Sequence, residues 1–312
     1  MIKIETYKPE YYSRWNQFIN NSKNGIFIFC RDYMEYHSDR FEDHSLLFFN
    51  NKKLVAVMPA NIKDDSLNSH DGLTFGGIIS NRKMTTSLML EIFNELKDYL
   101  KINGINKVLY KSIPHIYHLL PAEEDLYALI RNKAKLFRRD VSSTIFMEER
   151  IPYSRNKKRN MKISKKGGLK IEESHDFENF MNIEEKRLIE KYGVKPTHTA
   201  EEINLLASKF PDNIKLFTAK TVDNEIHGGV IIFDSENVAH AQYQAATDAG
   251  LKLGGTDLIF DFLINNYYKD KKYFDFGIST EKNGFYLNEG LISYKEQFGS
   301  RAVVHDFYEL VI

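Results

Sequence analysis

Two successive stretches of this chain carry the same order of predicted elements, and that repetition constrains the fold more than any other feature. Each stretch has helices, then short apolar runs joined by turns, then a helix, a strand, a helix and a strand. The first apolar runs turn at Asn50-Asn51, a pair that tolerates the positive φ of a tight hairpin. The order predicts two tandem copies of one α+β fold, each with a mixed, mostly antiparallel sheet flanked by helices.

The bounds of the elements follow from hydrophobic periodicity and from turn residues. Helices are expected over residues 8–20, 30–41, 85–101, 123–133, 177–192, 200–209, 256–268 and 285–297. Strands are expected over residues 46–49, 54–59, 73–79, 107–112, 141–147, 169–173, 216–221, 226–233, 238–246, 273–276 and 302–310. We therefore expect an N-terminal domain over 1–150 and a C-terminal domain over 151–312, the latter carrying the active site.

Composition agrees with this organisation and excludes several classes of protein. The 312 residues suffice for about two domains, and 42% hydrophobic residues exclude a disordered chain. Lys+Arg 43 against Asp+Glu 43 gives no net charge, so the charge footprint of a duplex nucleic-acid binder is missing. There is no apolar leader and no window of membrane-span length, so a cytoplasmic location is expected.

Metal and nucleotide cofactors are not expected either. The chain has one cysteine, Cys30, and the pair His115 and His118 has no third ligand nearby, so a zinc site is not indicated. No phosphate-binding or dinucleotide-binding glycine motif of the common types is present.

The strongest sign of chemistry lies near the C-terminus. The apolar strand 273–276 carries Asp275, and the polar loop and helix that follow hold Ser279, Tyr286 and Lys295. An unpaired buried carboxylate is disfavoured by several kcal/mol, so Asp275 must have a partner. It could accept a proton from an amine, with its pKa raised by desolvation, or form a structural hydrogen bond to a loop amide. From the residues alone, Lys295 could equally lie on a solvated helix face.

The strand 238–246 has a polar side. Alternation predicts that His240, Gln242 and Gln244 share one face, whereas the alanines at 239, 241 and 245 share the other with Tyr243. Three polar residues on one face are consistent with the wall of a cavity or with a sheet face open to water.

Several motifs, together with the order of elements, resemble the FemAB-type branch of the GNAT acyltransferase superfamily. They are Tyr273-Phe274-Asp275-Phe276-Gly277, Tyr294-Lys295-Glu296-Gln297-Phe298-Gly299, Thr74-Phe75-Gly76-Gly77 preceded by Pro59, and the basic segment 154–162. The resemblance implies two GNAT-like domains, of which the second holds the more complete site. It also implies acyl transfer to an amine, from acyl-CoA or from aminoacyl-tRNA. No sustained heptad is present, so the coiled-coil arm typical of many bridge-forming members is missing, which favours acyl-CoA.

The same resemblance implies roles for individual residues of the second domain. The candidate catalytic residues are Asp275, Lys295 and Tyr243. The candidate acyl-CoA contacts are Gln242, Gln244, Ala246, Leu253, Gly254, Gly255 and Thr256. The candidate contacts to the substrate are His240, Ser279, Tyr286, Arg155 and Arg159. Of the superfamily's pyrophosphate signature only Gly254 is matched, so the turn is also consistent with a plain loop in which Thr256 caps the next helix.

The basic run over residues 155–166 allows more than one interpretation. On a helix, Arg155, Arg159 and Lys162 fall on one stripe, which suits a phosphorylated donor or acceptor, although a solvated linker helix has the same pattern. We expect an N-acyltransferase that uses acetyl-CoA or another acyl-CoA and an amine acceptor, either a small molecule or a cell-envelope precursor. The alternatives are an aminoacyl-tRNA-dependent transferase of peptidoglycan-bridge synthesis and a catalytically silent GNAT-like binding protein.

Overall fold

The computed structural model describes residues 1–312 and divides into two compact units. The first unit consists of Met1–Val141, Thr280–Tyr286 and Val304–Ile312, and the second of Ser142–Ser279 and Leu287–Val303. Both units are discontinuous in sequence, because strands β9 (Lys135–Phe146) and β17 (Arg301–Val311) contribute residues to each. The division into domains at residue 150 stays a prediction.

The first unit contains a four-stranded antiparallel sheet. Its strands, in spatial order, are β1 (Ile2–Thr6), β3 (Leu46–Asn50), β4 (Lys53–Met58) and β7 (Ile79–Ser80). The predicted hairpin between β3 and β4 is confirmed, but its turn lies one residue later than predicted: Asn50 pairs with Lys53, and Asn51 and Lys52 have φ of 47° and 68°. The predicted strand over 73–79 is wrong except at its end, because Gly77 has a φ of +84° and Gly76 packs against the carbonyl of Ser69.

Further strands and helices complete the first unit. The strands pair in the order β17, β8 (Lys107–Lys111), β6 (Ser66–Asn68), β5 (Asn61–Lys63) and β2 (Glu42–Asp43). The α-helices are α1 (Tyr12–Asn21), α2 (Arg31–Met34), α3 (Thr86–Ile102) and α4 (Glu124–Arg131). The core includes Ile92, Phe93 and Leu96 of α3, which lie on one side of that helix as its periodicity predicts.

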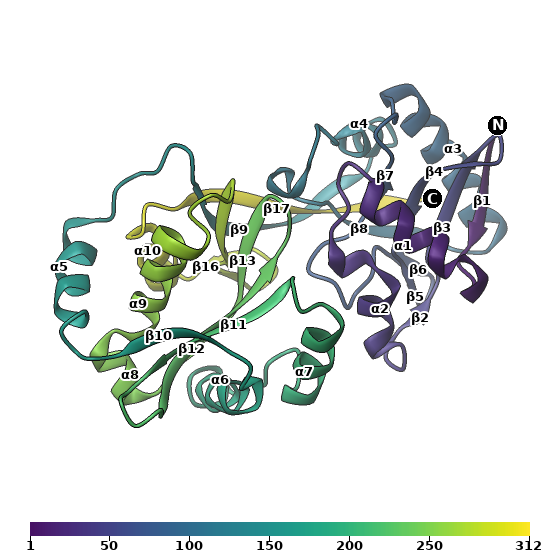
Figure 1. Ribbon diagram of the computed structural model, residues 1–312. Helices are drawn as coiled ribbons and strands as arrows, with labels where there is room; N and C mark the ends of the chain where they lie inside the picture. Colours follow the sequence, from purple (N-terminus) through teal and green to yellow (C-terminus); the bar gives the residue numbers. More distant parts are fainter. The chain divides into compact units, whose positions relative to one another are not determined.

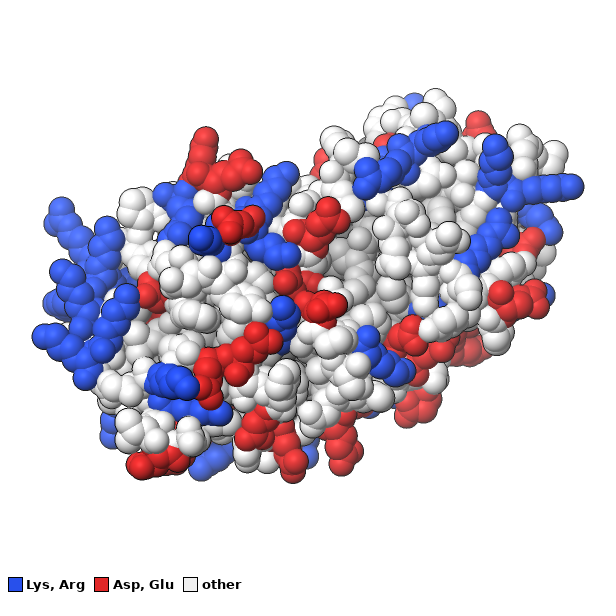
Figure 2. Space-filling view, viewed as in Figure 1, with Lys and Arg blue, Asp and Glu red and all other residues white.

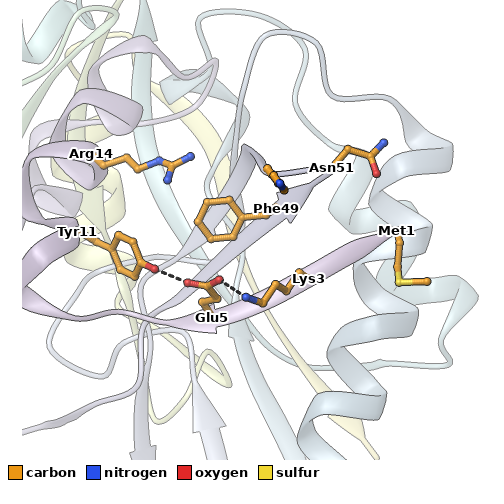
Figure 3. Close-up of a pocket in the computed structure, with 8 residues that line it drawn as sticks. Met1, Lys3, Glu5, Tyr11, Arg14, Phe49 and Asn51 are labelled. Carbon is orange, nitrogen blue, oxygen red and sulfur yellow. Dashed lines mark hydrogen bonds and ion pairs between the residues drawn. The ribbon is translucent and has the colours of Figure 1, made fainter.

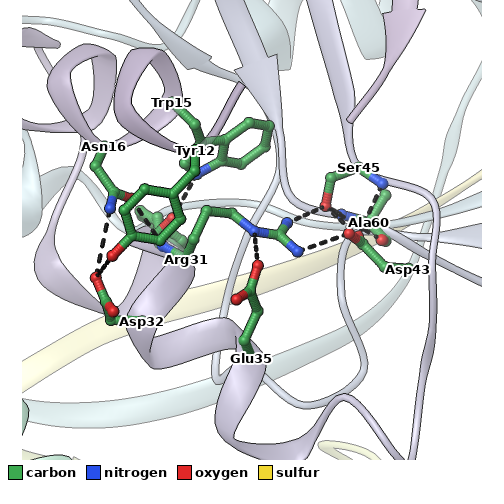
Figure 4. A network of polar contacts seen from close by, with 10 residues as sticks. Tyr12, Trp15, Asn16, Arg31, Asp32, Glu35, Asp43, Ser45 and Ala60 are labelled. Carbon is green, nitrogen blue, oxygen red and sulfur yellow. Dashed lines mark hydrogen bonds and ion pairs between the residues drawn. The ribbon is translucent and has the colours of Figure 1, made fainter. Parts of the chain in front are cut away.

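A buried arginine joins α2 to β2 in this unit. Arg31 donates from Nη2 to Asp43 at 2.7 Å and from Nε to Glu35 at 3.0 Å (Figure 4). Its guanidinium also lies 3.7 Å from the ring centroid of Tyr7. A charge can be buried when it is paired and hydrogen-bonded, so these contacts explain why Arg31 is inside.

The second unit is built on one mixed sheet. Its strands, in spatial order, are β10 (Lys170–Ser174), β11 (Ile214–Lys220), β12 (Ile226–Asp234), β13 (Val238–Ala246), β14 (Tyr273–Ile278) and the second-unit part of β9. All neighbours are antiparallel except β13 and β14, which are parallel. A parallel pair needs a crossover, and here helices α8 (Asp248–Leu253) and α9 (Gly255–Phe262) provide it.

Helices cover both faces of this sheet, and Figure 1 shows α6 (Phe177–Tyr192) and α7 (Ala200–Lys209) on one side with α9 and α10 (Glu289–Glu296) on the other. The side of α9 holds the main core, in which Ala241 and Phe274 of the sheet cluster with Leu258, Ile259 and Phe298. Helix α5 (Arg155–Ser164) packs against α9. The pair β15 (Thr280–Glu281) and β16 (Tyr286–Leu287) forms a short ribbon.

The ends of α6 and α7 agree with the predicted ends because residues that commonly cap helices stand at these positions in the sequence. Asp176 caps α6 by accepting from the N–H of Asn179, and Gly193 ends it with a φ of 67°. Thr199 and Glu202 form a capping box at the start of α7.

Candidate active site

A fully buried carboxylate, Asp275, is at the centre of a polar cluster on the sheet of the second unit. Its Oδ1 accepts hydrogen bonds from Ser142 Oγ at 2.6 Å and from Thr144 Oγ1 at 2.7 Å. Its Oδ2 lies 2.7 Å from Nδ1 of His240. The partner that a buried carboxylate requires is therefore a set of three side chains, not a loop amide alone.

Strand register brings this cluster together. Asp275 on β14 is directly opposite His240 on β13 and directly opposite Thr144 on β9. Residues opposite each other in a sheet point to the same face, and Ser142 is two residues from Thr144, so the four side chains converge. Sequence reasoning missed Ser142 and Thr144. Their alternation within the predicted strand 141–147 was the available signal.

The bond to Asp275 sets the tautomer of His240. An ionised carboxylate only accepts hydrogen bonds, so the proton of a neutral imidazole lies on Nδ1, and Nε2 keeps its lone pair. The His240 side chain remains 13% exposed, whereas that of Asp275 is inaccessible. The arrangement is that of an imidazole oriented by a buried carboxylate, with Nε2 available to accept a proton.

Gly277 and Lys295 shape the end of the same strand. Gly277 has a φ of +77°, and a Cβ there would lie 3.3 Å from Cε1 of His240. Lys295, from α10, donates to the carbonyls of Gly277 at 2.8 Å and of Ile278 at 2.7 Å. Burial lowers the pKa of Lys295 to about 8, and the charge of Asp275 opposes that shift. Lys295 is thus an internal residue and does not lie on a solvated helix face.

A β-bulge corrects the predicted polar face of β13. Ala241 is opposite Ile232 and Tyr243 is opposite Ile231, so Gln242 is the extra residue that has no opposite partner on β12. A bulge of one residue reverses the alternation beyond it. Tyr243 therefore shares the face of His240, and Gln244 points to the other face, contrary to the prediction.

Tyr243 is held in a second polar contact on that face. Its hydroxyl lies 2.6 Å from Nδ1 of His198 and accepts from the N–H of His198 at 3.2 Å. Burial raises the pKa of Tyr243 to about 12, so the phenol stays protonated near neutral pH.

The predicted glycine turn is largely helical. Residues 248–253 form α8, capped by the side chain of Thr247, and Gly254 ends it with a φ of +70°. The prediction that Thr256 caps the next helix is wrong: α9 begins at Gly255 with Gly254 as its N-cap residue, since the left-handed turn falls there. The turn packs against α5, because a Cβ on Gly254 would lie 2.1 Å from Ser164 Oγ. Leu253 and Thr256 are half-buried beside it.

The remaining predicted residues lie in different surroundings. The carbonyl of Ala246 accepts from Nε of Arg187 at 2.7 Å. Ser279 is buried in the second unit, and its Oγ has no hydrogen-bond partner. Tyr286 is 48% exposed and belongs to the first unit. Arg155 and Arg159 are exposed on α5.

A separate surface pocket of about 350 Å³ lies in the first unit (Figure 3). Its lining residues are Met1, Lys3, Glu5, Tyr11, Arg14, Phe49, Asn51 and Lys52. Glu5 accepts from Tyr11 and pairs with Lys3, so its carboxylate is already satisfied. None of the predicted site residues lines this pocket. No group of three or more His, Cys, Asp and Glu side chains is arranged to hold a metal ion.

Comparison with known proteins identifies the fold. The sequence matches no protein-family model and no curated protein. The structure is similar to FemX, with a TM-score of 0.69 and 10% identity, over 99% of this chain and 97% of that one. The C-terminal domain of a putative lysylphosphatidylglycerol synthetase from Agrobacterium fabrum gives a TM-score of 0.63 and 10% identity, over 96% of this chain and 91% of that one. A tandem GNAT protein from the clavulanic acid biosynthesis pathway gives a TM-score of 0.51 and 7% identity, over 99% of this chain and 98% of that one.

These likenesses confirm the predicted architecture. The chain has a FemAB-like, tandem GNAT-type fold of the α+β class. At such identities the likeness establishes the fold, and the chemistry has to be argued from the site itself. No helix of the chain has both the length and the apolar character needed to cross a bilayer.

Proposed function

We propose that this protein is an N-acyltransferase that moves an acyl group, most simply acetyl, from acyl-CoA to an amine of a sugar, peptide or metabolite. The hydrogen-bonded pair of His240 and Asp275 carries the proposal, because acyl transfer to an amine needs a base of moderate strength. The FemAB-like GNAT fold supports the same reaction class. We place the reaction in the cytoplasm, where acyl-CoA is available.

In this proposal His240 is the base, and Asp275 is a positioning residue. Both oxygens of Asp275 already accept hydrogen bonds and the residue is fully buried, so an amine has no direct route to it. The amine nitrogen attacks the thioester carbonyl and gives its proton to Nε2 of His240. The carbon–sulfur bond then breaks, and the imidazolium returns the proton to the thiolate, which leaves an amide and free CoA. Asp275 stabilises the imidazolium through Nδ1.

The edge of β13 supports an extended donor. The ladder with β14 ends at the pair of His240 and Asp275, whereas β13 continues to Ala246. Backbone groups of residues 241–245 that point toward β14 therefore have no strand partner there, and an extended ligand can pair with such an edge. The resemblance to GNAT proteins assigns that edge to the pantetheine arm and to the N–H that stabilises the oxyanion. The bulge at Gln242 redirects the backbone where that N–H is required.

Lys295 and Tyr243 have supporting roles. Lys295 fixes the carbonyls of Gly277 and Ile278 and so holds the end of the strand that carries Asp275. Tyr243 shares the face of His240 and keeps its proton at neutral pH, so its hydroxyl can donate a hydrogen bond to a substrate oxygen.

A thermal-shift panel tests the donor. Acetyl-CoA, longer acyl-CoAs and free CoA are each added to the intact protein. A ligand present at a hundred times its Kd stabilises the folded state by about 2.7 kcal/mol, which raises the melting temperature by several degrees. We expect a rise with at least one acyl-CoA, and release of thiol when an amine is then supplied. A His240→Ala variant should keep the thermal shift and lose the thiol release.

The second candidate is an aminoacyl-tRNA-dependent transferase of the type that builds peptidoglycan bridges, favoured by the exposed cations of α5. Binding of charged tRNA would fall steeply with salt and would weaken when Lys158 and Arg159 are neutralised, whereas CoA would give no rise in melting temperature. If neither donor binds, a catalytically silent GNAT-like binding protein is the remaining interpretation.

A further inference from the structure

The outer face of helix α5 carries a dense group of cations without counter-ions. No acidic residue occurs between residues 155 and 166. Two of the seven cations there are paired: Lys157 with Asp257 at 2.9 Å and Lys165 with Asp261 at 2.8 Å. The other five are exposed and form no ion pair; they are Arg155, Lys158, Arg159, Lys162 and Lys166. Figure 2 shows this group of Lys and Arg side chains over α5, and we call these five residues with Ile163 the α5 surface.

The inner face of α5 fixes how this surface is presented. Lys157, Met161 and Ser164 are buried at successive turns. The ammonium of Lys157 lies 4.2 Å from the ring centroid of Tyr294 and 4.3 Å from that of Phe298, in addition to its pair with Asp257. These contacts hold α5 against the second unit, so Arg155, Lys158, Arg159 and Lys162 project from a packed helix.

An aliphatic side chain lies among the cations. Ile163 is 65% exposed, and it follows Lys162 directly. On α5, Arg159 is one turn before Ile163, whereas Lys166 lies two residues beyond the end of the helix. Attraction of basic side chains to anionic lipids and burial of apolar area both contribute to binding at a membrane interface, and the α5 surface offers both.

We propose that the α5 surface docks on an anionic lipid bilayer, with the cations against the lipid phosphates and Ile163 inserted at the level of the headgroups. Clusters of four to eight basic residues on a helix are attracted to anionic leaflets, and an inserted aliphatic chain adds apolar burial. RNA would attract the same cations but would not stabilise an exposed isoleucine. The helix also has no aromatic side chain on which a base could stack.

The proposed docking goes beyond the proposed function and does not depend on it. Binding to the bilayer itself requires neither donor nor turnover, so it can be tested when the donor is unknown.

The test is co-sedimentation of the full chain with vesicles of phosphatidylcholine alone and of phosphatidylcholine mixed with phosphatidylglycerol. We expect binding to the mixed vesicles only, weakening as salt is raised. Neutralising three cations (Lys158→Gln, Lys162→Gln, Lys166→Gln) should lower the affinity about a hundredfold, since each basic residue contributes to attraction at the surface. Ile163→Ser should lower it several-fold and leave the salt dependence in place. The matched control is Lys186→Gln with Lys191→Gln on α6, which are exposed lysines outside the surface and should bind as the unaltered chain does.

Three results would overturn the proposal. They are absence of binding to the mixed vesicles, binding that the triple variant retains, and a tighter salt-sensitive complex with bulk tRNA that displaces the vesicles and is indifferent to Ile163→Ser. An unchanged melting temperature of each variant shows that the fold is intact. The thermal shift with acyl-CoA should be the same in the triple variant and in the unaltered chain. Failure of vesicle binding with a preserved CoA response would therefore reject the docking surface and leave the proposed function standing.

Discussion

Nδ1 of His240 lies 2.7 Å from Oδ2 of Asp275 at the last paired position of the parallel strands β13 and β14. Beyond this position β13 continues and has a bulge at Gln242. Strand β14 turns at Gly277, whose carbonyl accepts a hydrogen bond from Lys295. An oriented imidazole thus lies next to the point where a strand edge becomes unpaired. The proposed transfer needs a base beside a strand that can align an extended donor, and this geometry is consistent with both requirements.

Replacing the proposed base, His240, should lower the rate of the reaction and leave the protein folded. Replacing His240 by Ala removes the proposed proton acceptor, so kcat should fall by about 10²–10⁴, the usual contribution of general base catalysis. Asp275→Asn should lower kcat by a similar factor, because the amide cannot hold the imidazole in the same tautomer. Turnover at several amine concentrations, with circular dichroism as a check of folding, measures both. Full activity of either variant would show that the base is elsewhere.

A methyl group at Gly277 should disturb the same imidazole. Gly277→Ala places an L side chain at a φ of +77°, which costs about 1–2 kcal/mol, and puts its Cβ 3.3 Å from His240. We expect lower stability and at least about a tenfold loss in kcat, because small displacements of a catalytic group have large effects on rate.

Gly290→Ala on α10 is the matched control for that experiment. Its Cβ would meet nothing closer than Asn288 Oδ1 at 3.8 Å, and its φ is not in the left-handed region. It should be neutral or stabilise the helix by up to about 1 kcal/mol. Equal effects of the two alanines on kcat would contradict a special role for Gly277.

The neighbours of His240 on its face of the sheet could not be predicted from periodicity. A strict period of two assigns Gln242 and Gln244 to its face, but a single extra residue at Gln242 reverses the alternation and brings Tyr243 there instead. Bulges depend on the partner strand, so β13 alone contains no sign of one. The hydroxyls that hold Asp275 come from β9, which is more than a hundred residues away in sequence, and only the completed sheet makes them neighbours.

Local rules succeeded where the decisive contacts are local. The bounds of α6 and α7 follow from Asp176, Gly193 and a capping box, all within one turn of the helix ends. The hairpin between β3 and β4 follows from its Asn-rich turn. Lys295 marks the limit of local rules. A lysine in a polar helix is expected to be solvated, but the carbonyls of Gly277 and Ile278 and the charge of Asp275 favour the buried ammonium, and all three come from β14.

Removing Lys295 should destabilise the second unit. Lys295→Ala leaves the carbonyls of Gly277 and Ile278 without their buried donor, so the free energy of unfolding should fall by about 1–3 kcal/mol. Urea denaturation measures it. Lys272→Ala, at an exposed lysine beside the same strand, is the control and should change stability by less than about 0.5 kcal/mol.

The difference between the wild type and Lys295→Ala should also depend on pH. Burial lowers the pKa of Lys295 from 10.5 to about 8, so the unfolded chain binds more protons than the folded one between these two values. The contribution of Lys295 to stability should therefore rise as the pH is raised from about 8 to about 10.5. A constant difference across this window would show that the amine is not desolvated.

The contribution of Glu184 to stability should depend on pH in the opposite direction to that of Lys295, and at lower pH. This residue of α6 is only 6% exposed, has no hydrogen-bond or ion-pair partner, and has its pKa raised by burial from 4.5 to about 7. The folded chain therefore binds more protons than the unfolded one between these values, and stability should decrease as the pH rises through about 7. Glu184→Gln mimics the protonated acid, so it should match the wild type below about pH 4.5 and exceed it above about pH 8 by on the order of 3 kcal/mol. Glu185→Gln, its half-exposed neighbour paired with exposed Lys195, should change stability by less than about 1 kcal/mol. Denaturation midpoints at about pH 4.5, 7 and 8 test this prediction. If the stability of the wild type did not fall between about pH 4.5 and about pH 7, burial would not be raising the pKa of Glu184.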